Sequence, residues 1–270
     1  MELRSVSDLP EVRQGDDLAD LIRARTDLVA GDVVVVASTV VSKAEGRTAD
    51  CAEYLPGPRA RELAARLERL TGESKDPRFA QAVLEESTEV ILEAPFLLTE
   101  TRFGHVCVNA GIDRSNVPDA DLLLLPTNPM ASAERIRDGL REGVATGPSE
   151  ASAGAGSAGV EDVAVVVTDT CGRPFRHGQR GVALGWAGMP ASRDWRGECD
   201  REGRELGVTV QSVVDELAAA ANLVAGEGAG GTPVVVVRDF HFGDLEGSDE
   251  LFRPVETDFV RQALREWSYE

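Results

Sequence analysis

Lysine is almost missing from this chain. Only Lys43 and Lys75 are lysines among 28 basic residues, and 47 acidic residues give a formal net charge of -19 at pH 7. A field of this sign repels nucleic-acid phosphates, so we expect no DNA or RNA partner. Salt screens the repulsion between carboxylates, so the composition favours a halophilic protein of a salt-rich cytoplasm. A GC-rich genome would also favour arginine over lysine, but codon bias alone does not explain the acid excess.

Cysteine and histidine are also scarce, with four and three residues respectively. Cys51, Cys107, Cys171 and Cys199 form no CxxC pair and the histidines are scattered, which argues against a zinc site. No apolar run approaches the ~20 residues that a membrane helix needs. The first residues also lack the charged-then-apolar pattern of a secretory signal. We therefore expect a cytoplasmic protein without a membrane partner.

Near-continuous apolar runs predict buried strands at residues 32–37, 121–125, 163–167 and 233–237. Amphipathic patterns predict helices at residues 17–25, 58–70, 78–92, 131–141, 208–224 and 257–267. Residues 96–100 and 105–109 flank Phe103-Gly104 and predict an antiparallel hairpin. Because strands and helices do not alternate strictly, we predict an α+β (mixed α/β) fold of mixed sheets with flanking helices.

One stretch, at residues 143–160, is rich in glycine, alanine and serine and has no apolar period. Such a composition is typical of a flexible surface insertion. We predict one domain over residues 1–245 that carries this insertion, followed by an acidic C-terminal extension at residues 246–270 with a terminal helix.

The first candidate segment for chemistry, ASTVVSKAEGR, follows the predicted strand at residues 32–37 and contains Lys43. We predict a loop here, at a strand end, where ligands often meet a rigid scaffold. A lysine kept in a chain that otherwise uses arginine suggests a need for a compact ammonium group, for example to contact a phosphate. Chance is an equal alternative, because Lys75 is also kept, in an ordinary polar turn.

A second segment, NAGIDRSNVP, places Asp113 and Asn116 three residues apart in a turn-like context. Oxygen ligands of this kind suit Mg²⁺ or Mn²⁺. The same residue types are common in ordinary turns, so this segment alone is a weak indication.

The third segment, VAVVVTDTCGRPFR, is predicted to be a buried strand that ends at Asp169-Thr170 and turns at Gly172. A carboxylate and a hydroxyl at a strand end can hold a metal that bridges phosphates. Arg173 and Arg176 follow and can stabilise phosphate or carboxylate charge. The alternative is an aspartate that caps a turn beside two solvated arginines.

The fourth segment, AGEGAGGT at residues 225–232, precedes the last predicted strand. Glycines allow backbone N–H groups to approach phosphates closely. The pattern is neither a P-loop nor a dinucleotide fingerprint, so from the pattern alone a helix end with a loose connection is the better explanation. Glu227 is its only acidic residue and would suit a metal ligand.

Taken together and in order, the segments of this chain resemble the coenzyme F420-0:L-glutamate ligases. The resemblance covers roughly residues 1–245, except 143–159, and rests on LPEV, STVVSKAEGR, AVLEES, VCVNAGIDRSNV, VTDTCGRPFR and GRELGVTVQSVVDELAAAANLVAGEGAGGTPVVVVR. It implies that GTP phosphorylates the acceptor carboxylate and that the amine of L-glutamate attacks the acyl phosphate, with release of GDP and phosphate. One glutamate would be added to F420-0, then a second through a γ-linkage. A two-lobed homodimer with the nucleotide in a groove is also implied.

The resemblance further implies particular site residues. Asp113 and Asp169 would hold one divalent metal, and Thr170 and Glu227 a second. Together with Arg173, the residues Lys43, Asp113 and Asp169 would be catalytic. The implied nucleotide-binding residues are Leu9, Pro10, Glu11, Val12, Ser38, Thr39, Lys43, Asn116, Ala225, Gly226, Glu227, Gly228, Ala229, Gly230, Gly231 and Thr232. The implied cofactors are GTP as co-substrate, two Mg²⁺ or Mn²⁺ ions and K⁺, with F420-0 and L-glutamate as the other small-molecule partners.

Two other function classes stay open. One is a metal-dependent phosphohydrolase or nucleotidyl transferase that uses the same carboxylates, and the other is a non-catalytic nucleotide-binding regulator. GxSxG, HExxH and Cys/His signatures are missing, which agrees with a reaction that needs charge neutralisation more than a covalent nucleophile. Some relatives carry a fused C-terminal flavin-binding domain, and a chain of 270 residues is too short for one, so we expect a short glutamate tail.

Overall fold

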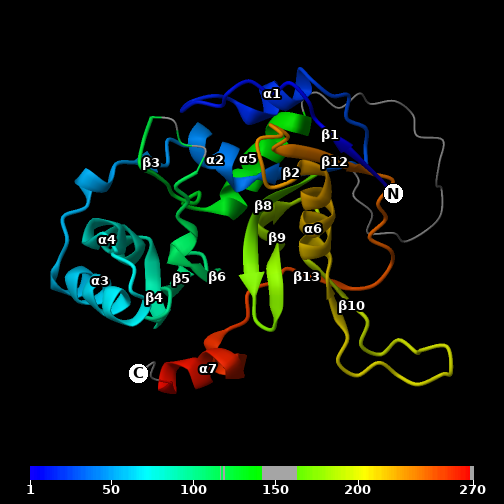
Figure 1. The fold of residues 1–270 in the computed structure, drawn as a ribbon. Helices are drawn as coiled ribbons and strands as arrows, with labels where there is room; N and C mark the ends of the chain where they lie inside the picture. The colour runs from blue at the N-terminus through cyan, green and yellow to red at the C-terminus, as the bar shows by residue number, and fades with distance from the viewer. Residues whose placement is uncertain (116, 118, 142–162, 268–270) are drawn as a thin grey trace. The chain divides into compact units, whose positions relative to one another are not determined.

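The structure, a computed structural model, describes residues 1–115, 117, 119–141 and 163–267 (Figure 1). The chain forms two compact units. The first unit consists of residues 1–44 and 128–251, and the second begins with residues 45–127 and is completed by the segment from Phe252 onward. The predicted C-terminal extension is therefore divided between the units, and the predicted insertion at 143–160 lies outside the described residues. Helices combined with mixed and antiparallel sheets confirm the predicted α+β class.

A five-stranded sheet forms the centre of the first unit, in the order β1-β12-β2-β8-β9. Neighbouring strands are antiparallel except β2 and β8, which are parallel. The strands of this sheet are β1 (Glu2–Ser5), β2 (Val33–Ala37), β8 (Ala164–Arg173), β9 (Arg176–Ala187) and β12 (Val234–Arg238). A smaller antiparallel sheet contains β10 (Ser192–Asp194), β11 (Val210–Ser212) and β13 (Gly247–Ser248).

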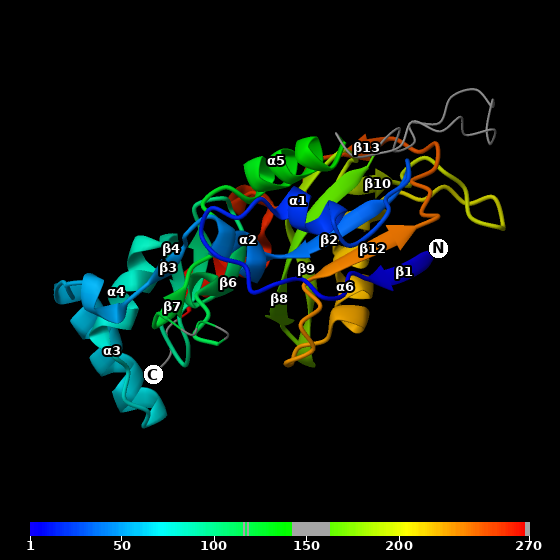
Figure 2. The same cartoon turned by 90° about the horizontal axis from the view of Figure 1, so that it is seen from above.

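Helices cover both faces of the five-stranded sheet (Figure 2). Side chains alternate between the faces of a strand, so Val34 and Val36 pack on one face of β2 while Val33 and Val35 pack on the other. Apolar residues of α1 and α5 cover the first face, and those of α6 cover the second. The helices of this unit are α1 (Leu18–Arg23), α2 (Ser38–Ala44), α5 (Pro129–Arg141) and α6 (Val213–Ala225). Burial on both faces explains the nearly continuous valine runs.

The second unit has its own core around Leu63, Val83, Leu97 and Leu122. Its helices α3 (Pro58–Thr71) and α4 (Pro77–Glu85) pack with an antiparallel sheet of β4 (Ser87–Leu92), β5 (Leu98–Thr101) and β6 (Val106–Val108). The remaining elements are β3 (Thr48–Ala49), β7 (Leu122–Leu123), α7 (Phe259–Glu266) and the short 3-10 helices η1 (Cys51–Glu53), η2 (Asn109–Gly111) and η3 (Val255–Thr257). The predicted hairpin is confirmed by the pairing of β5 with β6.

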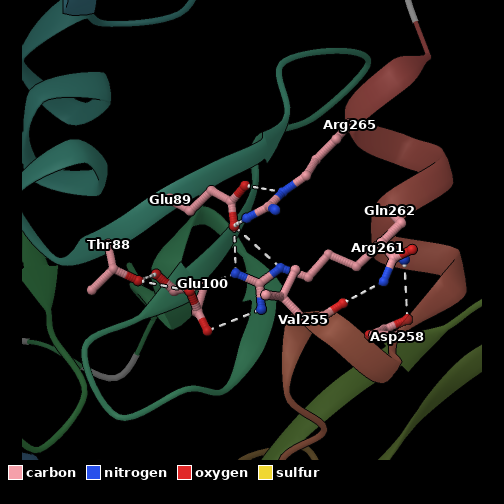
Figure 3. A network of polar contacts seen from close by, with 8 residues as sticks. All are labelled: Thr88, Glu89, Glu100, Val255, Asp258, Arg261, Gln262 and Arg265. Carbon is pink, nitrogen blue, oxygen red and sulfur yellow. Dashed lines mark hydrogen bonds and ion pairs between the residues drawn. The ribbon is translucent and has the colours of Figure 1, made fainter.

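An ion-pair network, here called the α7 clamp, holds α7 against β4 and β5 (Figure 3). Arg261 is 7% exposed and its guanidinium contacts both Glu89 on β4 and Glu100 on β5. Arg265 contacts Glu89 from one turn further along the helix. Asp258 caps α7 by accepting a hydrogen bond from the Arg261 N–H.

Two predicted helices are wrong in part. The helix predicted at residues 78–92 ends at Glu85, and Ser87–Leu92 instead forms β4. The helix predicted at residues 208–224 starts only at Val213, because Val210–Ser212 pairs with β10 as β11. In both cases the pairing of a neighbouring strand overrides a local apolar pattern that fits either structure.

Candidate functional site

One end of the five-stranded sheet gathers most of the predicted site segments. Ala37, the last residue of β2, lies opposite Thr168 of the parallel strand β8. The N–H of Ala37 also donates to the carbonyl oxygen of Pro233, 2.8 Å away, just before β12. Three segments therefore meet here. One begins at Ser38, one continues from Thr168, and one ends at Thr232. We call this region, made of residues 38–43, 169–170 and 225–232, the sheet-end site; mixed sheets commonly hold ligands at such parallel strand ends.

The segment after β2 is not the predicted loop, because Ser38–Ala44 forms helix α2. Ser38 is buried in this helix, Thr39 is half-buried, and Lys43 lies in its last turn. The Nζ of Lys43 lies 2.5 Å from the Oε1 of Glu11, and the Lys43 side chain is only 12% exposed. The packing of Val40 and Val41 into the core explains why β-branched residues are tolerated in so short a helix.

Residues 9–12 (LPEV) lie against α2, and two of them are packed in the core while two are exposed. Val12 is buried in the core and Leu9 packs against the same cluster, so their side chains anchor the segment. Pro10 and Glu11 are exposed, and Glu11 forms the ion pair with Lys43. The structure therefore brings together Glu11 and Lys43, two residues predicted to lie at the nucleotide.

Asp169 and Thr170 do not end a strand as predicted, because β8 continues to Arg173. Asp169 lies opposite Val182 and Thr170 opposite Gly181 in the antiparallel pairing with β9. Consecutive strand residues face opposite sides, so the Asp169 carboxylate and the Thr170 hydroxyl lie on different faces of the sheet. The two residues are half-buried and are separated from the buried run Ala164–Val167 by Thr168.

The residue after this pair, Cys171, is a free cysteine. Burial raises the pKa of its thiol, and the negative charge of Asp169 raises it further. The thiol is therefore kept protonated at neutral pH, which makes Cys171 a poor nucleophile.

Sequence reasoning missed Arg180, which lies on β9 directly opposite Cys171. Its Nη2 is 3.4 Å from the Oδ2 of Asp215, an acid in the first turn of α6. The exposed first half of β9 has no apolar run, so the sequence gives no strand signal before Val182. Arg173, which was predicted, donates from Nη1 to the carbonyl oxygen of Gly178 at 3.1 Å and so braces the turn of the hairpin.

The glycine-rich segment begins at Ala225, the last residue of α6, and continues to Thr232 before β12. Gly226, Gly228, Ala229, Gly230 and Gly231 are all exposed, as is Glu227. The Oε1 of Glu227 accepts a hydrogen bond of 2.8 Å from Nδ2 of Asn222 on α6. The helix thus fixes the one acidic side chain of an otherwise glycine-rich segment.

Another predicted ligand, Asp113, lies in the second unit. Asp113 is half-buried and its backbone forms a bridge with Leu123. Its carboxylate accepts hydrogen bonds from the N–H groups of Arg114 and Ser115, at 2.6 and 2.8 Å, and from the Ser115 hydroxyl at 2.8 Å. Asn116 lies outside the described residues. Within the described ranges, no three His, Cys, Asp or Glu side chains form a group able to hold a metal ion.

An α+β fold with polar residues gathered at the ends of parallel strands is typical of enzymes that bind small ligands. A family model described as F420-0:Gamma-glutamyl ligase matches residues 7–239 of the chain. The coenzyme F420:L-glutamate ligase of Halorubrum lacusprofundi is 66% identical over 270 residues, which cover 100% of both chains. A protein with the same name in Halobacterium salinarum is 66% identical over 100% of this chain and 99% of the relative. One in Archaeoglobus fulgidus is 47% identical over 98% of each chain. The chain belongs to the F420-0:gamma-glutamyl ligase family.

Among the described residues, none of the helices combines the length and the apolar character that crossing a bilayer requires.

Proposed function

We propose that this protein is a GTP-dependent ligase that adds L-glutamate to coenzyme F420-0, first one residue and then a second through a γ-linkage. GTP transfers its γ-phosphoryl group to the acceptor carboxylate, which gives an acyl phosphate and GDP. The glutamate amine then attacks the acyl carbon, the C–O bond to phosphate breaks, phosphate leaves, and the amine loses its proton. The membership of the family and the names of its relatives support this substrate assignment.

The observation that best supports nucleotide use is the meeting of three separate segments at the sheet-end site, with Glu11 beside Lys43. In our proposal, Lys43 and Glu11 lie beside GTP, where the ammonium group binds a phosphate oxygen. Ser38 and Thr39 at the start of α2 and the exposed glycines after α6 surround the nucleotide. Arg173 stabilises the charge of the phosphate or of the acceptor carboxylate.

The donor set fits hard divalent cations, because Asp113, Asp169, Thr170 and Glu227 offer only carboxylate and hydroxyl oxygens. Asp113 and Glu227 are each held by neighbouring hydrogen bonds, which leave further lone pairs on their oxygens. We propose Asp113 and Asp169 for one Mg²⁺ or Mn²⁺ and Thr170 and Glu227 for a second, with Asn116 at the nucleotide. When bound, these ions neutralise phosphate charge during transfer. K⁺ is proposed as an additional monovalent cofactor.

GDP release tests the proposed reaction. The full chain is incubated with GTP, Mn²⁺, L-glutamate and F420-0, and each component is left out in turn. A ligase of this mechanism releases GDP over many turnovers only when glutamate and the acceptor are both present, because the acyl phosphate formed in the first step must react with glutamate before the next turnover. GDP release that is independent of glutamate and acceptor would indicate a phosphohydrolase, and binding without turnover would indicate a regulator.

Three properties complete the proposal: a homodimer, a cytoplasmic location and adaptation to high salt. Light scattering during size-exclusion chromatography measures the mass of the assembly. A monomer at every concentration would contradict the proposed dimer.

A further inference from the structure

The turn between β8 and β9 carries an aromatic residue whose backbone conformation is energetically unfavourable. Phe175 is fully exposed, and its φ of 66° lies in the left-handed region that bulky residues rarely adopt. Pro174 and this positive φ give the turn the pattern of type II, in which glycine or asparagine is favoured at the position of Phe175. Strained, exposed residues of this kind concentrate at functional sites. Folding of the first unit therefore gives no reason for a phenylalanine here.

The strand ends beside this ring are cationic, although the whole chain has a net charge of -19. Arg173 and Arg176 pair directly across the turn, and His177 follows. In the part of the chain that the structure describes, neither arginine forms an ion pair with a carboxylate, and residues 170–182 contain no acid. The tip is thus an unneutralised positive patch that flanks an aromatic ring.

One face of the hairpin connects this tip to the sheet-end site. Asp169, Cys171 and Arg173 alternate along β8, so their side chains share a face. Arg180 lies opposite Cys171, and Arg176 lies opposite Arg173 beyond a shift of register after Gly172, so we assign both positions to that face, although the Arg180 guanidinium reaches Asp215 on α6. At the usual rise of a strand, the four steps from Asp169 to Arg173 span roughly 13 Å. Figure 1 shows the two strands continuing side by side to their tight turn.

We propose that this hairpin tip, residues 173–177, binds the acceptor substrate, and that the acceptor is an anion with a planar aromatic ring. The ring stacks on Phe175, and an anionic group of the acceptor other than its reacting carboxylate, such as a phosphate, accepts hydrogen bonds from Arg173 and Arg176. The reacting end of the acceptor then points along the shared face toward Asp169. This inference rests on the proposed function, because it assigns the acceptor to the hairpin and the nucleotide to the sheet-end site.

Calorimetric titration of F420-0 into the full chain, with GDP and Mg²⁺ present, measures this binding directly. Phe175→Gly and Arg176→Gln are the test variants, and Phe175→Gly also relieves the left-handed strain, so it is expected to fold. Loss of one stacked ring should weaken F420-0 binding about five- to 150-fold while leaving GDP binding unchanged. Arg201→Gln removes an exposed arginine from a different loop and is the matched control, with unchanged binding expected.

Simple probes separate the two parts of the acceptor. Flavin mononucleotide, which combines a ring with a phosphate, should bind more tightly than riboflavin or inorganic phosphate alone. Added KCl should weaken flavin mononucleotide binding to the wild type more than to Arg176→Gln, because salt screens the arginine contact. Equal binding of all three probes, or a salt response that is the same in both proteins, would overturn the proposal.

The kinetic outcome distinguishes this inference from the proposed function. If both hold, the variants raise the KM for F420-0 while the KM for GTP stays unchanged. GDP release by the wild type without glutamate or acceptor would contradict the proposed function. Normal wild-type turnover with unchanged F420-0 affinity in both variants would overturn only the hairpin assignment. Phe175→Gly could also change the oligomeric state while its affinity for F420-0 stays the same. That result would show that a second copy of the chain covers the ring, and it would also overturn the assignment of the acceptor to the hairpin tip.

Discussion

Replacing Arg261 by methionine is expected to free α7 from β4 and β5. The substitution keeps an apolar stem of similar reach but removes the guanidinium that donates from Nη1 and Nη2 to the two oxygens of Glu100, at 3.0 and 2.6 Å. It leaves Glu89 and Glu100 facing each other with side chains only 23% and 22% exposed. Breaking a buried ion pair costs about 3–5 kcal/mol, and the partial exposure of both acids puts our expectation near the lower end, about 3 kcal/mol.

The loss should depend on pH. Hydrogen bonds from Arg265, and next from Arg261, hold the pKa of Glu89 below its usual value. A lowered pKa gives stability that is present above the unfolded pKa of about 4.3 and is lost as the pH falls through the folded pKa. In Arg261→Met, Glu100 loses its arginine and Glu89 keeps only the exposed Arg265, so the two acids repel each other until they are protonated. The difference between wild type and variant should therefore be largest near neutral pH and shrink below about pH 4.

Hydrogen exchange with mass spectrometry is the assay of choice, because a chain with two units need not unfold in one step. Peptides covering α7 and β4 should lose protection in Arg261→Met at pH 7. Arg265→Met is the matched control, since its side chain is 44% exposed and a much smaller effect is expected. Adding Glu89→Gln and Glu100→Gln to Arg261→Met should restore much of the protection. Wild-type protection in Arg261→Met, or a loss that does not shrink on acidification, would refute the reasoning.

Three further predictions concern the first unit and the whole chain. Lys43→Arg should raise the KM for GTP without changing the circular dichroism spectrum, because a planar guanidinium replaces the compact ammonium group beside Glu11. Unchanged GTP kinetics would refute this role of Lys43. Gly181→Ala should lower the free energy of unfolding by about 1–3 kcal/mol in calorimetry, since the new Cβ would lie 2.4 Å from the Ala218 carbonyl oxygen. Gly172→Ala is the control, because its Cβ would meet nothing within 4 Å, and its stability should stay close to that of the wild type. The midpoint of thermal unfolding should rise steeply with KCl, because salt screens the net charge of -19, and a midpoint independent of KCl would contradict salt adaptation.

The strands that were predicted best are buried on both faces. The runs that became β2, β8 and β12 are nearly all valine, and such runs need no tertiary information to be recognised. β9 was missed because its first half is exposed and polar and is held mainly by pairing with β8. α2 was predicted as a loop because it has only seven residues and two adjacent valines, and its packing against the sheet decides its structure.

The sequence could suggest candidate site residues but not how they are arranged. Lys43 could be singled out by its rarity, yet its contact with Glu11 joins residues 32 positions apart and depends on the packing of Val12. Asp169 was predicted to end a strand, whereas the register with β9 places it mid-strand and on the opposite face from Thr170. Phe175 had no sequence signal at all, because only the backbone conformation of the turn shows that its position is strained.

The central claim is that this protein joins L-glutamate to F420-0 at the expense of GTP. Mass spectrometry of the acceptor after incubation with GTP, Mn²⁺ and L-glutamate tests it most directly, with Asp169→Asn run in parallel. We expect products heavier by one and by two glutamates with the wild type, and almost none with Asp169→Asn. An acceptor of unchanged mass in the presence of GTP hydrolysis, or full product formation by Asp169→Asn, would contradict it.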